Sequence, residues 1–383
     1  MEVAATAHHD GADDYERILY TTTEKLNIEQ GFYSGGVLLR DGRVVLVPSD
    51  EAHIAIFDMA TQSVTKGWLN MHDDVFEGAP HGGAYSGGVL LPDGRVVFVP
   101  YHATVIGIFN PETNEFREVP GAPGDGAYSD GVLLSDGRVV FVPSDATTIG
   151  IFDSATDTYS EIAAGAPSTC AYFGGILLPD GRVLFVPRHS TEIGMFNPET
   201  NEYSTVPGVS VEQNGYCGGV LLPDGRVVFV PHMATTIGIF DPATNEYSTI
   251  PGAPGNWAYR SGLLLPDGRV AFIPGTAKTV GIFNASATPP TYSELAGLPG
   301  NSSYENGVLL ADDRVLLLPW RTRRIGILSF SDEKARARAH KRTQEIKQEL
   351  IAAAWHPSRM LDWCLDNNDR CELAEMELSA MEI

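Results

Sequence analysis

Cysteine is scarce in this chain. Only 4 of its 383 residues are cysteine, and no two of them form a CxxC motif. A small fold held together by disulfides is therefore excluded, and we expect free thiols in a reducing compartment.

Basic residues are also in short supply. The chain carries 26 lysines and arginines against 49 aspartates and glutamates, a formal net charge of -23 at pH 7. Such a field repels phosphate groups at long range. The composition therefore predicts that neither nucleic acid nor an anionic membrane is a partner.

Long apolar runs are missing as well. No stretch approaches the 18 or more apolar residues of a membrane-spanning helix, and the N-terminal residues lack a basic region followed by an apolar one. We therefore expect no membrane span, no secretory signal and a cytoplasmic location.

What the chain does contain is one stretch repeated seven times, seen most clearly from Tyr216 to Tyr247. The successive copies begin 52, 43, 44, 44, 43 and 45 residues apart. A fixed period of this length indicates a repeat architecture. The tyrosines that open the copies are Tyr33, Tyr85, Tyr128, Tyr172, Tyr216, Tyr259 and Tyr304.

Each copy reads as four short strands. Runs such as GGVLL, RVVFVP, TIGIF and EYSTI are rich in β-branched and aromatic residues, and Asp-Gly or Asx-Pro turns separate them. Four-stranded antiparallel units of this size pack around an axis, so the sequence predicts an all-β, seven-bladed β-propeller.

The two ends of the chain complete the predicted organisation. The seventh copy lacks a fourth strand, and a segment at about 17–23 has the spacing to supply it and close the ring. We expect residues 1–13 to be disordered and the propeller to occupy 14–330. The helical period and the N-capping Ser331 predict an α-helical tail over 331–383.

Residues 33–330 resemble the kelch-type and streptogramin-lyase-type (virginiamycin B lyase) propeller repeats. The segments Val99 to Phe109 and Val230 to Phe240 are similar to the lyase layout, in which a Pro-Asp-Gly turn leads to an aromatic strand and then to an Ile-Gly strand. The double glycine of kelch repeats is Val-Pro here. The histidines and glutamate of the lyase motif have no one-to-one counterparts, so the resemblance implies the fold and no activity.

Comparing the seven copies separates scaffold from variation. The Asp-Gly-Arg turn barely changes, and we interpret its arginines as forming blade-to-blade hydrogen bonds and not an anion-binding ring. The five residues after each second-strand proline keep their length and change identity. In an antiparallel blade they lie opposite the Asp-Gly turns, on a variable face where binding groups are expected. Candidate binding residues on this face are Asp50, Tyr101, His102, Asp145, Arg188, His189, His232, Trp320 and Arg321.

Two functions remain open at this point. The first hypothesis is a non-catalytic propeller that binds a protein or small ligand on the variable face, without a cofactor. The alternative is a lyase or hydrolase with a divalent metal near the axis, held by His102, His189 and His232 with Asp50 or Asp145. No Ser-His-Asp order, phosphate loop or HExxH motif occurs in the sequence. Single solvent-exposed histidines are the simpler interpretation of the three imidazoles.

Overall fold

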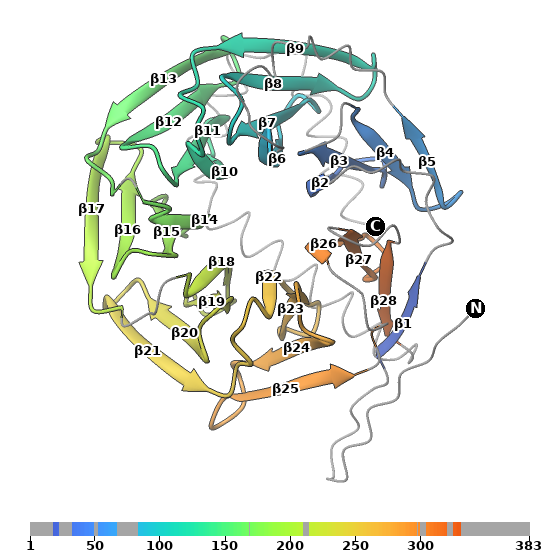
Figure 1. Cartoon of the computed structure of the whole chain (residues 1–383), viewed down its shortest axis with the longest axis vertical. Helices are drawn as coiled ribbons and strands as arrows, with labels where there is room; N and C mark the ends of the chain where they lie inside the picture. The colour runs from blue at the N-terminus through green and yellow to red at the C-terminus, as the bar shows by residue number, and fades with distance from the viewer. Residues whose placement is uncertain are drawn as a thin grey trace, which may run out of the picture.

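The computed structural model shows an all-β, seven-bladed propeller (Figure 1). Its described residues are 18–22, 33–49, 53–66, 83–167, 169–209, 214–296, 298, 304–319 and 325–330. They form seven four-stranded antiparallel sheets and contain no helix, hence none that could span a membrane. The predicted disordered N-terminus (1–13) and helical tail (331–383) lie outside them.

The first strand of every blade lies nearest the axis, and each following strand lies farther out (Figure 1). The first strands are β2 (Tyr33–Leu38), β6 (Tyr85–Leu90), β10 (Tyr128–Leu133), β14 (Tyr172–Leu177), β18 (Tyr216–Leu221), β22 (Tyr259–Leu264) and β26 (Tyr304–Leu309). The second strands are β3 (Val44–Pro48), β7 (Val96–Pro100), β11 (Arg138–Pro143), β15 (Val183–Pro187), β19 (Val227–Pro231), β23 (Val270–Pro274) and β27 (Val315–Pro319). The third strands are β4 (Ala55–Asp58), β8 (Val105–Asn110), β12 (Thr148–Asp153), β16 (Glu192–Asn197), β20 (Thr236–Asp241), β24 (Thr279–Asn284) and β28 (Gly326–Phe330). The fourth strands of blades 1 to 6 are β5 (Ser63–Lys66), β9 (Glu115–Pro120), β13 (Thr158–Ala163), β17 (Glu202–Pro207), β21 (Glu246–Pro251) and β25 (Thr291–Ala296).

The outer strand of blade 7 is β1 (Ile18–Thr22), from the other end of the chain. It pairs antiparallel with β28, with Ile18 opposite Phe330 and Thr22 opposite Gly326, in the order β1-β28-β27-β26. That the ring depends on this strand for its stability stays a prediction.

An aromatic stack fills each typical blade. In blade 3, Phe141 lies between Tyr128 and Tyr159, with ring centroids 5.5 and 6.3 Å apart, and the two tyrosine hydroxyls are hydrogen-bonded at 2.6 Å. The third strand contributes Gly150, because a Cβ there would lie 2.9 Å from the Tyr128 ring. Blade 2 has Phe116 where blades 3 to 6 have the outer tyrosine, and the buried hydroxyl of Tyr85 consequently has no partner among the described residues.

Glycine is also required where the blades meet at the axis. A Cβ on Gly131 would lie 2.8 Å from Val89 and 2.9 Å from Val99 of the preceding blade. A Cβ on Gly175 or Gly219 would come equally close to side chains of the blade before it. The second glycine of the GG motif therefore allows neighbouring first strands to approach closely.

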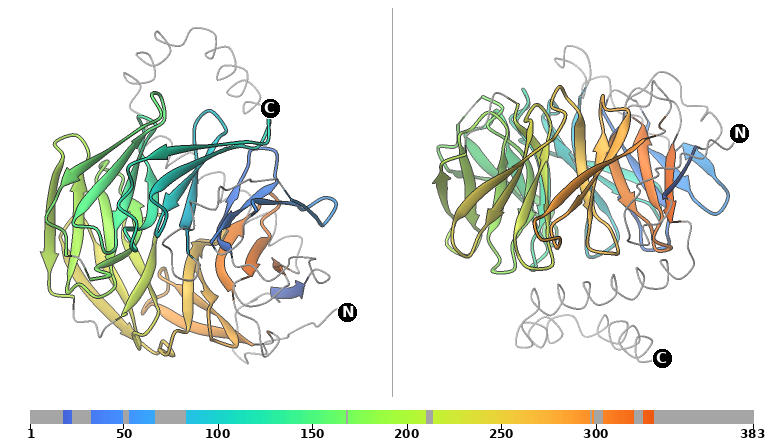
Figure 2. Two further views of the ribbon diagram at one scale, coloured as in Figure 1. Left: turned by 45° about the horizontal axis from the view of Figure 1, so that its top comes forward. Right: turned by 90° about the horizontal axis from the view of Figure 1, so that it is seen from below.

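The strands cross the ring from one face to the other (Figure 2, right). The Asp-Gly turns lie on one face, called here the turn face. The connections that follow the second and fourth strands lie on the opposite, variable face.

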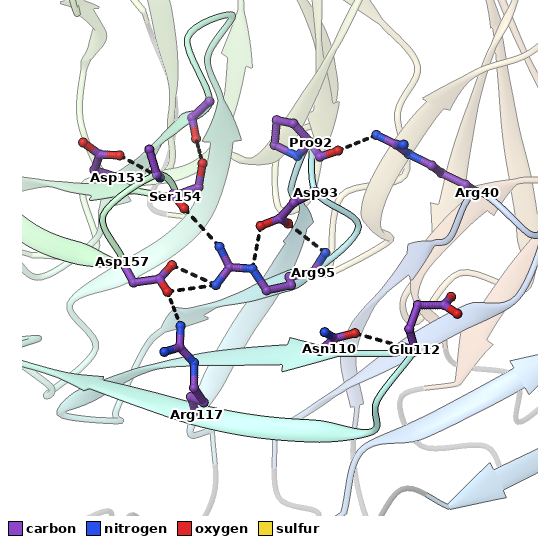
Figure 3. A network of polar contacts seen from close by, with 12 residues as sticks. Arg40, Pro92, Asp93, Arg95, Asn110, Glu112, Arg117, Asp153, Ser154 and Asp157 are labelled. Atoms are coloured by element: carbon purple, nitrogen blue, oxygen red, sulfur yellow. Dashed lines mark hydrogen bonds and ion pairs between the residues drawn. The ribbon is translucent and has the colours of Figure 1, made fainter. Parts of the chain in front are cut away.

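On the turn face, four of the seven turn arginines contact the neighbouring blade, which confirms the predicted blade-to-blade role for these four: Arg43, Arg95, Arg138 and Arg182. Arg95 donates to Asp93 in its own turn and to Asp157 and the Ser154 carbonyl of the next blade, and Arg117 also pairs with Asp157 (Figure 3). The same bridge recurs from Arg138 to the Pro198 carbonyl at 3.2 Å and from Arg182 to that of Pro242 at 3.5 Å. A different interblade contact joins Arg40, which precedes its turn, to the Pro92 carbonyl at 2.6 Å.

Candidate functional site

A continuous belt of backbone hydrogen bonds runs around the variable face from blade 1 to blade 6. It alternates between the residue that precedes a first strand and the residue that follows a second strand. Ten bonds of 2.8 to 3.0 Å form it: Ala84 N to Ser49 O, Tyr101 N to Ala84 O, Ala127 N to Tyr101 O, Ser144 N to Ala127 O, Ala171 N to Ser144 O, Arg188 N to Ala171 O, Gly215 N to Arg188 O, His232 N to Gly215 O, Ala258 N to His232 O and Gly275 N to Ala258 O.

The two kinds of belt residue differ in what they carry. The lead-in residues are all small: Ala84, Ala127, Ala171, Gly215 and Ala258. The exit residues vary in size and chemistry: Ser49, Tyr101, Ser144, Arg188, His232 and Gly275. Because the backbone makes the bonds, the identity of an exit side chain does not affect them. The belt therefore fixes the backbone of the exit residues, while their side chains are free to vary.

The predicted site residues divide into three groups on this frame. Tyr101, Arg188 and His232 are exit residues of the belt, and His102, Asp145 and His189 each follow an exit residue. Asp50, Trp320 and Arg321 lie outside the described residues, as does the inserted loop at 67–82.

A second shared position was missed by the sequence reasoning. The residue two before each opening tyrosine has a positive φ in every blade where it is described. The five residues are Gly83 (94°), Gly126 (78°), Cys170 (48°), Asn214 (61°) and Trp257 (61°). Glycine adopts this conformation freely and asparagine tolerates it, whereas a bulky side chain is strained there.

Trp257 is the most unusual of these residues. Its loop, GAPGNWAY at 252–259, matches GAPGDGAY at 121–128 in sequence and in its run of positive φ angles, with Trp257 in the place of Gly126. Backbone strain of this kind costs on the order of 1 to 3 kcal/mol and concentrates at functional sites. The Trp257 side chain is 38% exposed, and its ring lies edge-on to His232 with the centroids 4.8 Å apart. Comparing the two loops in the sequence would have exposed the substitution.

Arg188 is held from two sides. Its Nε donates to Asn214 Oδ1 at 2.9 Å, and its guanidinium carbon lies 4.7 Å from the centroid of the Phe173 ring. Its remaining N–H donors have no acceptor among the described residues. Arg188 is thus a positioned guanidinium with donors available to a ligand.

His232 is buried and neutral. Its Nδ1 donates to the Tyr259 carbonyl at 2.7 Å, which leaves Nε2 as an acceptor. Burial lowers the pKa of His232 to about 4, and the positive charges of Arg260 and Arg188 act in the same direction. The imidazole therefore carries no charge at neutral pH.

The polar network continues from His232 towards blade 7. The Tyr259 carbonyl also accepts from Cys217 Sγ at 3.1 Å, and Arg260 pairs with Glu305 at 3.3 Å. Burial raises the pKa of Glu305, against the influence of Arg260 and Arg188, and its Oε2 has no hydrogen-bond partner among the described residues. Arg188, Arg260 and the carboxyl group of Glu305 therefore lie near His232 in this part of the belt.

The two nearby thiols are not activated for nucleophilic chemistry. Burial raises the pKa of Cys217 to about 12, and burial together with Asp145 raises that of Cys170, so both remain protonated at neutral pH. Asp145 accepts a hydrogen bond from Cys170 N at 2.7 Å, and Tyr101 lies beside both residues.

The three histidines proposed as metal ligands each have a different environment. The His102 ring packs edge-on against Tyr101, His189 Nδ1 bonds to the Thr169 carbonyl at 2.9 Å, and His232 is buried in its own network. The described part of the chain contains no group of three or more His, Cys, Asp or Glu that could hold a metal ion. A site completed by Asp50, outside that part, stays a prediction.

The turn face has a cavity of about 460 Å³ between blades 7 and 1. Asp41, Arg43, Asp58, Asp312 and Arg314 are among its lining residues. Each of the two arginines is bonded to the aspartate of its own turn, and Asp58 caps the turn at Ala60. Because the repeated turn contacts already engage these groups, the belt is the better candidate site.

The fold defines the class of this molecule as a seven-bladed β-propeller, and the belt gives it one face with variable side chains. No family model matches the sequence, and a search of curated proteins finds no match. Solved structures do match. A streptogramin B lyase has a TM-score of 0.68 at 19% identity, covering 82% of this chain and 98% of its own. The virginiamycin B lyase from Staphylococcus aureus has 0.68 at 16%, covering 82% and 99%. The RRP9 WD40 repeats have 0.58 at 11%, covering 81% and 97%.

These similarities confirm the predicted propeller and the predicted likeness to streptogramin-lyase propellers. At identities below 25% they show the fold alone.

Proposed function

We propose that this protein is a non-catalytic binding propeller that holds its ligand on the variable face, in the sector of the belt between blades 4 and 6. The observation that carries the proposal is Trp257. A large, exposed aromatic side chain occupies a strained backbone position that the matching loop fills with Gly126. Strain retained at a residue that contacts the exit residue His232 is consistent with selection for binding.

The state of the surrounding groups favours binding over catalysis. Burial lowers the pKa of His232 to about 4, so its imidazole is a weak base, and both described thiols remain protonated at neutral pH. These groups are suited to recognising a ligand and poorly suited to transferring a proton or attacking a substrate at neutral pH.

A metal-dependent lyase or hydrolase is the alternative. Two similar structures are lyases, but their activity belongs to those proteins. The alternative requires a divalent ion held by His102, His189 or His232 with Asp50 or Asp145. Metal analysis of the purified protein tests it, since stoichiometric metal that is lost in a His189→Ala variant would favour the enzyme.

A protein partner stays a second prediction, on the part of the variable face around Trp320, Arg321 and the inserted loop. The cytoplasmic location also stays a prediction. Neither is needed for a ligand at the belt.

Ligand-observed NMR tests the binding site itself. The probes are a fragment set of anionic, neutral and cationic aromatic compounds with aliphatic counterparts, added to the full chain. Compounds that lose binding in Trp257→Gly or Arg188→Gln, and keep it in Arg226→Gln on the turn face, support the proposal. Arg226 is a matched control because it bonds to Asp224 of its own turn. If no compound depends on either belt-side residue, the proposal is wrong.

A further inference from the structure

We infer that the ligand of the belt is a small aromatic carboxylate, with its ring on Trp257 and its carboxylate on Arg188. This inference rests on the proposed function and adds the chemical class of the ligand.

The sign of the local charge is the first step. The chain as a whole is strongly acidic, yet the charged groups that act on His232 are the cations Arg260 and Arg188. Glu305 is paired with Arg260, and Asp145 accepts the Cys170 N–H. Arg188 is thus a cation that acts on His232 and forms no ion pair among the described residues of this acidic protein. A cationic ligand is disfavoured there and an anion is favoured.

The shape of the donor group is the second step. A guanidinium whose Nε is held by Asn214 keeps its outer edge available, and that edge presents two parallel N–H groups. A planar carboxylate accepts both in a bidentate pair. The Phe173 ring, with its centroid 4.7 Å from the guanidinium carbon, covers one side of the group, so an acceptor approaches the edge that remains available.

The aromatic groups give the third step. The exposed Trp257 ring is a surface on which a planar group can stack, and His232 supports its edge. Aromatic sites for cations also use such rings, but they do not place two arginines beside them. A flat ring that carries a carboxylate can stack on the Trp257 ring and place its acid group on the Arg188 guanidinium.

The neutral imidazole orients the ligand. His232 Nε2 is an acceptor and offers no proton to a carboxylate. The acid group is therefore directed to Arg188, and the ring to Trp257. A doubly charged phosphate is less favoured, because one available guanidinium then faces two charges within a strongly acidic chain.

Four naphthalene compounds test these steps by titration calorimetry on the full chain. They are 2-naphthoate, the neutral 2-naphthamide, the non-planar decahydro-2-naphthoate and 2-naphthyl phosphate. We expect 2-naphthoate to bind at least about tenfold more tightly than each of the others, a difference of about 1.4 kcal/mol. Arg188→Gln should remove the preference over naphthamide, and Trp257→Gly should remove the preference over the decahydro acid. Arg226→Gln should change neither.

Several results would overturn the inference. Equal binding of naphthoate and naphthamide would exclude the carboxylate, and equal binding of the planar and non-planar acids would exclude the aromatic ring. Tighter binding of the phosphate would replace the carboxylate by a phosphate. If naphthoate fails but another fragment depends on Trp257, only the ligand class is wrong. If no compound depends on Trp257 or Arg188, the proposed function is wrong as well.

Discussion

The two faces of this propeller join their blades by different means. On the turn face, side chains form the bridges, as in the contacts of Arg95 with Asp157 and the Ser154 carbonyl (Figure 3). On the variable face, the backbone forms the belt and the side chains project from it. The turn face must therefore repeat its residues, whereas the variable face is free to change them. This difference explains why a regular repeat is combined with an irregular site.

We expect the largest loss of stability when the closing strand β1 is removed, because the ring of blades carries both faces. Deleting residues 1–24 removes β1 and leaves the edge of β28 unpaired. An exposed edge strand promotes association between chains. We expect aggregation or loss of cooperative unfolding, measured by light scattering and by urea denaturation. A monomeric truncated chain with an unchanged unfolding midpoint would show that the closing strand is dispensable.

The half-buried Asp130 at the axis makes stability depend on pH. Its Oδ2 accepts from Gly175 N of the next blade at 3.0 Å, and burial raises its pKa to about 6 from 3.8. A raised carboxyl pKa gives stability that is present below pH 3.8 and lost as the pH rises through 6. Relative to Asp130→Asn, the wild-type free energy of unfolding should fall by about 2 to 3 kcal/mol between pH 4 and 7.

The control for this prediction exists within the chain. Asn306 occupies the equivalent position of blade 7 and accepts from Gly307 N at 2.7 Å, so the propeller accommodates the amide. Parallel pH profiles of the wild-type and Asp130→Asn proteins would contradict the raised pKa.

The two faces are compared directly by removing one arginine from each. Arg95→Ala breaks an interblade network of charged hydrogen bonds, and we expect a loss of about 2 kcal/mol in the free energy of unfolding. Arg188→Ala leaves the belt bonds intact, and we expect a loss below about 1 kcal/mol. Urea denaturation measures both. Equal losses would show that the variable face also depends on its side chains.

A smaller effect tests the repeated core. Phe116→Tyr in blade 2 would give the buried Tyr85 hydroxyl the partner that Tyr159 provides in blade 3. One neutral hydrogen bond contributes about 1 kcal/mol. We expect an increase of that size in the free energy of unfolding, and a decrease would mean that blade 2 packs differently from its neighbours.

The sequence was sufficient for the propeller, because Tyr, Asp-Gly-Arg and the glycine pairs recur at fixed spacing and each has one structural role. It also located the face on which Arg188 and His232 lie. The belt could not be predicted, since backbone groups form it and no residue type marks it. The network joining His232, Cys217 and Glu305 depends on the curvature of the ring, which brings residues of three blades together.

The most direct test of the backbone belt is native-state amide hydrogen exchange at the exit residues Tyr101, Arg188 and His232. If backbone bonds hold the variable face, these amides should exchange as slowly as those of the second strands. Their protection should also be unchanged in the Arg188→Ala and Trp257→Gly variants. Fast, loop-like exchange at these three amides, or protection that is lost with the side chains, would contradict the belt.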